Sequence, residues 1–240
     1  MESYKVQFTI EDRFLDKVGR VRPGALLYFA QEAAGAHCSL MGASNIGNLF
    51  WAVIRHRVQI TRLPVAGETI TVETWPMPTS RTAFPRVCFG YDKDGNELFA
   101  IYSLWVLMDM NTRAMVLPGK SCVDVPGIQK GYEPDAPGSI LPKELPIASV
   151  RTVVQEDLDK NGHMNNTRYL DWVWELLPGQ WWDKMPREFT VCYLSECRFG
   201  QEMFLSFGEI APNTIQFEGR RAKTDHPEKT ERVFAVNVSF

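Results

Sequence analysis

The chain has 240 residues, a length that suits one large domain or two small ones, and its 45% hydrophobic content supplies a sizeable core. The net charge of −3 argues against nucleic acid as a main partner, and no apolar run approaches the ~20 residues of a membrane span. The five cysteines are odd in number and unclustered, which favours free thiols in a reducing cytosol over a disulfide framework or zinc site. We therefore expect a cytoplasmic globular protein.

The first half of the chain predicts an α+β unit. Residues 1–14 lack the apolar core of a signal peptide and the composition of a transit peptide, and they predict a strand. Pro23 suits a first helical turn, and the small residues of 25–40 predict a helix that lies close against a sheet. Strand patterns separated by turn residues then follow at 52–60, 69–74, 84–91, 98–108 and 114–117. One helix followed by a run of antiparallel strands is typical of the α+β class.

The second half repeats this unit. Sliding the chain by 143 residues places 15–32 over 158–175 without a gap, and six of the eighteen positions coincide. A helix is expected at 166–177, where apolar residues recur at helical spacing before Pro178-Gly179. Further strands are expected at 189–194, 203–209, 214–221 and 232–238. We interpret the pattern as a duplication of one structural unit.

The two units are joined by a proline-rich segment. Six prolines fall within the 29 residues 118–146, a density that excludes a helix or an inner strand. We therefore expect an N-terminal unit at 1–120, an ordered or semi-rigid linker at 121–148 and a C-terminal unit at 149–240.

A cluster of polar side chains precedes the second helix. Asp159, Asn161 and His163 occupy alternate positions, so in an extended chain their side chains would point to one side and converge. The first copy keeps the aspartate but has Val18 and Arg20 at the other two positions. Since only one copy carries the amide and the imidazole, we predict that the chemistry belongs to the second unit.

A purely structural interpretation of this cluster stays open. Asp159 can close a turn before Gly162, and Asn165 or Asn166 can cap the helix that follows. A metal site would need a third ligand beside Asp159 and His163, and none stands at metal spacing, so no metal is expected. Of the other histidines, we expect His37 to be a packed side chain of the first helix, His56 to be a strand residue and His226 to lie in an exposed turn.

A second candidate group is Glu196-Cys197, an acid beside a thiol at the end of an apolar strand. This position can bring both side chains to the entrance of the second helix, although a buried cysteine and a solvated glutamate are the plainer interpretations. The sequence has no nucleophile-elbow serine motif, no phosphate-binding loop and no dinucleotide fingerprint, so no cofactor is expected.

The run from Asp157 to Tyr169 resembles the Asp-x-Asn-x-His-hydrophobic-Asn-Asn-x-x-Tyr signature of the acyl-ACP thioesterases, and Glu196-Cys197 matches the Glu-Cys pair of that family. The segments 51–55 and 67–75 resemble its first unit more loosely. The resemblance implies a tandem hotdog fold, in which each unit is a long helix wrapped by a curved antiparallel sheet. It also implies hydrolysis of fatty acyl-acyl carrier protein. Since a plant-type targeting extension is lacking, the chain looks like a bacterial-type member.

The family pattern places the acyl chain in the first unit, and we expect pocket depth to depend on Leu26, Phe29, Ala33 and Trp51. For catalysis we expect Asp159 to attack or to activate water, with His163 sharing a proton and Asn161 holding the geometry. Glu196 is a second candidate base, and backbone N–H groups at the start of the second helix are candidates for the oxyanion site. A rival assignment makes Cys197 the nucleophile.

Other functions stay open at this point. An acyl-CoA thioesterase would need a local basic site for the nucleotide, for which Arg220-Arg221-x-Lys223 is a candidate. A hotdog hydratase fits less well, because its paired histidine and acid come from a different pattern. A non-catalytic module that binds acyl chains or the carrier protein is the non-enzyme alternative. Both a monomer and a homodimer are compatible with two fused units.

Overall fold

The computed structural model describes residues 2–159 and 161–240, which form two compact units. The units are Met1–Pro137 and Gly138–Phe240, and the boundary falls inside the proline-rich segment. Of the described helices, none is both long and apolar enough to cross a membrane.

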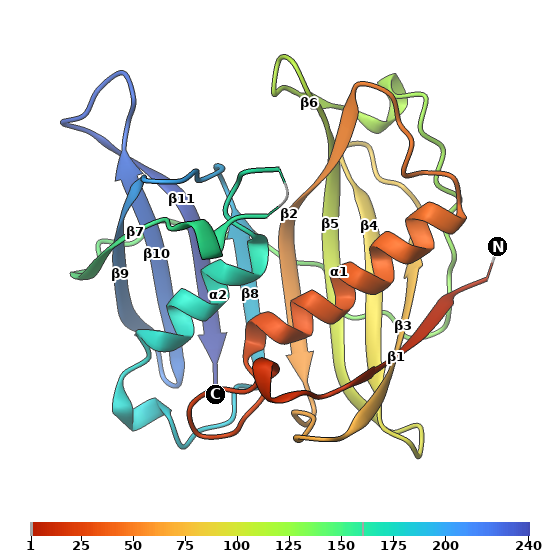
Figure 1. Cartoon of the computed structure of the whole chain (residues 1–240), viewed down its shortest axis with the longest axis horizontal. Coiled ribbons are helices and arrows are strands. Elements are labelled where there is room, and N and C mark those ends of the chain that lie inside the picture. The colour runs from red at the N-terminus through yellow and green to blue at the C-terminus, as the bar shows by residue number, and fades with distance from the viewer. Residues whose placement is uncertain (1, 160) are drawn as a thin grey trace. The chain divides into compact units, whose positions relative to one another are not determined.

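The first unit is one antiparallel sheet with a helix across one face (Figure 1). In spatial order its strands are β1 (Tyr4–Thr9), β3 (Thr69–Pro76), β4 (Phe84–Tyr91), β5 (Glu97–Asp109) and β2 (Leu49–Ile60), with β6 (Met115–Val116) paired to β5. The helix α1 (Pro23–Leu40) begins with its proline in the first turn, where a missing N–H costs nothing. Its alanines at 25, 30, 33 and 34 are buried, which allows close packing on the sheet.

The second unit repeats this order (Figure 1). Its strands are β7 (Ile147–Thr152), β9 (Glu202–Ala211), β10 (Thr214–Ala222), β11 (Thr230–Ser239) and β8 (Glu188–Tyr193). The helix α2 (Asn166–Glu175) has ten residues against eighteen in α1. Single 3-10 turns lie at Asp12–Phe14, Pro118–Lys120, Gln155–Asp157 and Gly179–Trp181. Each unit is therefore a hotdog, a helix wrapped by an antiparallel sheet.

A pair of glycines marks the repeat inside the sheets. Gly90 lies opposite Phe99, and Gly219 lies opposite Phe234, each beside a β-bulge. A Cβ at either glycine would overlap the facing phenylalanine ring. The same glycine, ring and bulge in both units confirm the duplication that the sequence predicts, and they align β4 with β10.

All expected strands are present, but the sequence analysis missed β7. This strand lies at the sheet edge beside β9 and buries none of its residues fully, with Val150 51% exposed. The strand nevertheless fits the duplication, because β1 begins at Tyr4 and β7 begins at Ile147, which is the same offset of 143 residues.

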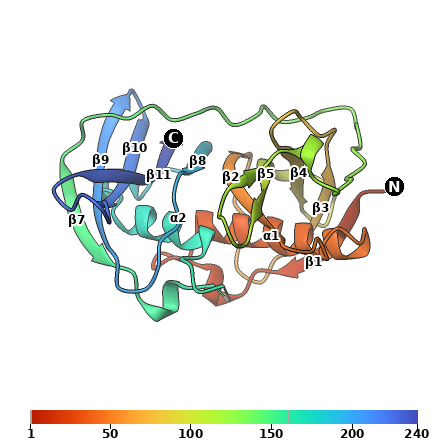
Figure 2. The same cartoon turned by 90° about the horizontal axis from the view of Figure 1, so that it is seen from above.

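The proline-rich segment lies on the face of each sheet opposite its helix (Figure 2). In the first unit, Ile128 packs on the cluster of Trp75, Val87 and Phe89, and Lys130 lies 4.7 Å above the Trp75 ring. In the second unit the Gln216 side-chain amide donates to the Leu141 carbonyl at 2.9 Å, and Arg232 donates to the Ile140 carbonyl at 3.1 Å. Side-chain contacts therefore hold the segment in place on both units.

Candidate active site

The cluster before α2 is a tight turn, so the expected extended geometry is wrong. The Asp159 N–H donates to the His163 carbonyl at 2.7 Å, and the Gly162 N–H donates to the Asp159 carbonyl at 3.0 Å. Gly162 has φ of +75°, a left-handed conformation that glycine adopts without strain. The three polar residues still come together, because the chain folds back on itself.

The Asp159 carboxylate closes this turn, as the structural interpretation predicts. Its Oδ1 accepts the backbone N–H groups of Asn161 at 2.8 Å and His163 at 3.2 Å. Its Oδ2 accepts the Asn161 side-chain amide at 3.2 Å. Asn161 is therefore a partner of the aspartate, and both are fixed by short local contacts.

The first unit contains the same turn with a different last residue. Asp16 Oδ1 accepts the N–H groups of Val18 and Arg20, both at 2.9 Å, and Gly19 has φ of +80°. Here the Arg20 Nε donates to Asp16 Oδ2 at 3.2 Å, the bond that the Asn161 amide makes in the second unit. The replacement of Arg20 by His163 puts an imidazole at the end of the second turn.

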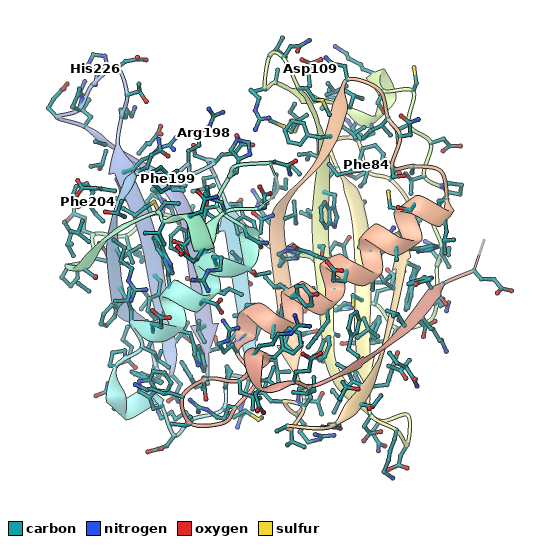
Figure 3. All side chains as sticks on the ribbon, in the orientation of Figure 1. Phe84, Asp109, Arg198, Phe199, Phe204 and His226 are labelled. Atoms are coloured by element: carbon teal, nitrogen blue, oxygen red, sulfur yellow. The ribbon has the colours of Figure 1, made fainter. Side chains whose placement is uncertain are left out.

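That imidazole faces an acid on a neighbouring loop. His163 Nε2 lies 3.5 Å from Glu196 Oε2, and the two side chains are 17% and 42% exposed. The backbone brings them together, because the Met164 N–H donates to the Cys197 carbonyl at 2.8 Å and His163 forms an isolated bridge with Arg198. Glu196 and Cys197 therefore lie at the helix entrance, as predicted. Figure 3 labels Arg198 and the 65% exposed Phe199, which continue this loop.

Arg221 of β10 holds the loop that carries Glu196. Its Nη2 donates to Ser195 Oγ at 2.8 Å, and its Nη1 donates to the Glu196 carbonyl at 2.5 Å and to Gln201 Oε1 at 2.8 Å. Glu231 accepts from its Nε at 2.8 Å. The side chain is 16% exposed, so these contacts weigh against Arg221 as part of an open nucleotide site. Sequence reasoning missed this positioning role.

Cys197 is fully buried behind the loop. Its Sγ lies 3.3 Å from Met203 Sδ, and Tyr169 is a hydrogen-bonding neighbour. Burial raises the pKa of the thiol, while nearby Arg221 lowers it to a smaller extent. A neutral thiol without exposed surface is a poor nucleophile, so the geometry disfavours the cysteine route.

The start of α2 is fixed by residues that the sequence analysis partly missed. Asn165 is the N-cap, and its side chain accepts the Thr167 N–H at 3.0 Å. Asp157, 1% exposed, accepts from Arg168 Nε at 3.0 Å, and its carbonyl accepts the Asn165 N–H at 2.8 Å. The Arg168 guanidinium also pairs with Asp171 at 3.0 Å. The ion pair between Arg168 and the buried Asp157 therefore holds the helix to the chain just before the turn.

The four expected acyl-chain residues lie in the first unit. Leu26, Phe29 and Ala33 have no exposed surface on the inner face of α1, and Phe29 contacts the Phe8 ring at 4.9 Å between centroids. Trp51 of β2 is partly buried and donates from Nε1 to the Ala43 carbonyl at 2.9 Å. These side chains therefore share the helix-covered part of the first unit.

Known proteins share this arrangement along nearly the whole chain. The acyl-ACP thioesterase N-terminal domain matches residues 1–118, and the acyl-ACP thioesterase C-terminal domain matches residues 145–231. The chain therefore belongs to the acyl-ACP thioesterase family, and the resemblance found in its sequence is confirmed.

Curated proteins and solved structures of the same family are similar to this chain. A chloroplastic palmitoyl-acyl carrier protein thioesterase of Cuphea hookeriana is 29% identical over 73% of this chain and 46% of its own length. The chain thus spans about half the length of that relative. An acyl-ACP thioesterase from Bacteroides thetaiotaomicron has a TM-score of 0.87 at 26% identity, covering 99% of this chain and 97% of its own. A 12:0-ACP thioesterase from Umbellularia californica shares the fold, with a TM-score of 0.76 at 21% identity, covering 99% of this chain and 96% of its own.

Proposed function

We propose that the chain hydrolyses the thioester between a fatty acyl chain and acyl carrier protein, releasing a free fatty acid and the holo carrier. Membership of the acyl-ACP thioesterase family supports this function. The observation that carries it is the approach of His163 to Glu196, 3.5 Å apart and both partly exposed, at a turn whose first-unit copy has Arg20 in place of the histidine.

The pair suits thioester hydrolysis. A water must lose a proton as it attacks the carbonyl carbon, and the leaving thiolate has a pKa of about 8.5, so it needs only weak acid assistance. We assign Glu196 as the base that takes the proton from water, with the His163 imidazole orienting that water or sharing the proton. Distances between catalytic groups commonly shorten when substrate binds.

We propose that Asp159 both holds the turn in place and supports the reaction. Its carboxylate already accepts three hydrogen bonds, which fix the backbone of His163 and the side chain of Asn161. By fixing the backbone of His163, the carboxylate holds the imidazole in place near Glu196. Direct attack by Asp159 on the thioester, or activation of water by it, is the alternative role.

The carrier protein is the proposed partner, and acyl-CoA is the alternative substrate. Arg221, a member of the basic group considered for a CoA nucleotide, is bound to Glu231 and Ser195, so the CoA alternative has less support. We propose that the acyl chain lies in the first unit beside Leu26 and Phe29, and that the second unit carries the chemistry. A cytoplasmic location and either a monomer or a homodimer fit this proposal.

The test is release of free thiol from a panel of acyl-ACPs and from the matching acyl-CoAs. We expect release from acyl-ACP that falls at least a hundredfold in His163→Ala and Glu196→Gln, with unchanged melting temperatures. Faster turnover of acyl-CoA would favour the CoA alternative. Chain binding without release from either carrier would favour a non-catalytic module.

A further inference from the structure

A buried arginine lies under the second half of α1 in the first unit. Arg86 of β4 is 8% exposed, and its Nη1 lies 3.3 Å from His37 Nδ1 and 3.2 Å from Thr74 Oγ1. Because a guanidinium only donates, His37 Nδ1 accepts, which leaves the imidazole proton on Nε2. The cluster therefore consists of one cation and two neutral groups inside a helix-covered sheet.

The charge of Arg86 has no counter-ion in the described part of the chain. No aspartate or glutamate oxygen of residues 2–159 and 161–240 lies within 4.0 Å of its guanidinium. Besides His37, the ionisable groups that act on it are the thiols of Cys38 and Cys88. Burial lowers the pKa of Arg86 to about 10, so the group is still charged at neutral pH. A buried cation without an anion carries a desolvation penalty that folding alone does not repay.

The second unit shows that the fold does not require this cluster. With Gly90 aligned on Gly219, the position of Arg86 falls on Ile215. Cys88 and its partner Thr74 fall on Phe217 and its partner Phe207. These three residues of the second unit are apolar, and the two rings pack with centroids 5.5 Å apart. The same positions form an ordinary core in one unit and hold a charge in the other.

We propose that Arg86, together with His37 and Thr74, forms a polar subsite for an acyl chain that carries an oxygen atom away from its thioester. This inference rests on the proposed function and on an acyl chain that lies beside α1. Among the described residues, the Arg86 Nε and Nη2 have no hydrogen-bond partner, so their N–H groups can donate to a hydroxyl, keto or carboxylate oxygen. An unmodified chain would leave these donors unsatisfied, which is a basis for selectivity.

The test compares carrier proteins loaded with chains of one length: unmodified, hydroxylated at successive carbons, or carboxylated at the far end. For each, kcat/KM is measured for the wild type and Arg86→Met, a substitution that keeps the length but removes the donors. For at least one oxygenated chain, we expect the ratio of its kcat/KM to that of the unmodified chain to fall by about tenfold or more in the variant. The hydroxylated and carboxylated arms show which oxygen the subsite takes.

The ratio between substrates cancels any loss of folded enzyme. Cys88→Ala, two residues along the strand, leaves the guanidinium in place and should lower stability without changing the ratio. Equal losses for all chains in Arg86→Met would overturn the subsite. If no acyl-ACP is hydrolysed at all, the proposed function fails separately, and calorimetry with free fatty acids and hydroxy fatty acids still decides whether Arg86 binds the oxygen.

Discussion

Asp16 and Asp159 close the same turn, once in each unit of the chain. Each carboxylate accepts the backbone N–H groups two and four residues ahead, and each turn has a glycine with positive φ at its fourth position. The two units differ in the last side chain of the turn, where Arg20 binds back to its aspartate and His163 approaches Glu196 instead. The duplication thus supplies an internal control for separating structure from chemistry.

Replacing either aspartate by asparagine separates the structural role of Asp159 from its role in the reaction. An amide oxygen still accepts the N–H groups of the turn, but it carries no charge and removes no proton. We expect Asp16→Asn and Asp159→Asn to lower stability by similar amounts, about 1 kcal/mol. Only Asp159→Asn should lower hydrolysis, by about a hundredfold or more. Thermal melts and thiol-release kinetics check both, and equal activity of the two variants would reduce Asp159 to a structural residue.

Removing the thiol of Cys197 should leave turnover nearly intact. The side chain has no exposed surface and burial raises its pKa, so the reactive thiolate is scarce at neutral pH. We expect Cys197→Ala to keep kcat within about threefold of the wild type while losing about 1–2 kcal/mol of stability from the lost packing. Cys192→Ala, also buried, serves as the packing control. A thousandfold loss confined to Cys197→Ala would restore the cysteine nucleophile.

Arg221 should control kcat through the position of Glu196. Its guanidinium holds Ser195, the Glu196 carbonyl and Gln201, so its loss releases the loop beside His163. We expect Arg221→Gln to lower kcat by about ten- to a hundredfold with little change in KM, because the guanidinium is bound within the protein and positions the loop. Arg221→Lys should fare little better, since one ammonium cannot replace the planar fork.

The control for that variant is Glu231→Gln, which keeps an acceptor for Arg221 but removes its charged partner. Its kcat should lie between those of the wild type and Arg221→Gln. A rise in KM with unchanged kcat in Arg221→Gln would instead mean that the arginine contacts the substrate.

Local patterns were enough to predict most of the fold. Glycine and proline positions, helical spacing in 166–177 and alternation in the strands are short-range signals, and the structure has the helices and strands they predict. The strand β7 was missed because it lies at a sheet edge with both faces largely exposed, so it lacks an apolar pattern. The turn at Asp159 was predicted as extended because alternate polar residues fit either geometry.

Groups that act through distant parts of the chain could not be predicted in the same way. Arg221 reaches Ser195 and Gln201, 26 and 20 residues away, and these contacts depend on how β9, β10 and β11 align. Arg86 lies in a strand whose other residues through Gly90 are also buried, so nothing local marks it as a charge inside the core. The hydrogen bonds of Arg221 reveal its role, and the comparison of the two aligned sheets marks Arg86.

His56 should make the first unit sensitive to acid. It has no exposed surface on β2 and its Nδ1 lies 2.8 Å from Ser103 Oγ, and burial lowers its pKa to about 3. The unfolded chain binds a proton at this histidine below pH ~6.5, whereas the folded protein does not until the pH nears 3, so acid favours unfolding across that window. Between pH 7 and pH 5 this histidine alone should lower the free energy of unfolding by about 2 kcal/mol. Denaturant titrations of the wild type and His56→Gln measure the difference, because the glutamine does not titrate and all other groups are shared. The profile of the variant should be flatter by that amount, and parallel profiles would mean that His56 is protonated in the folded protein.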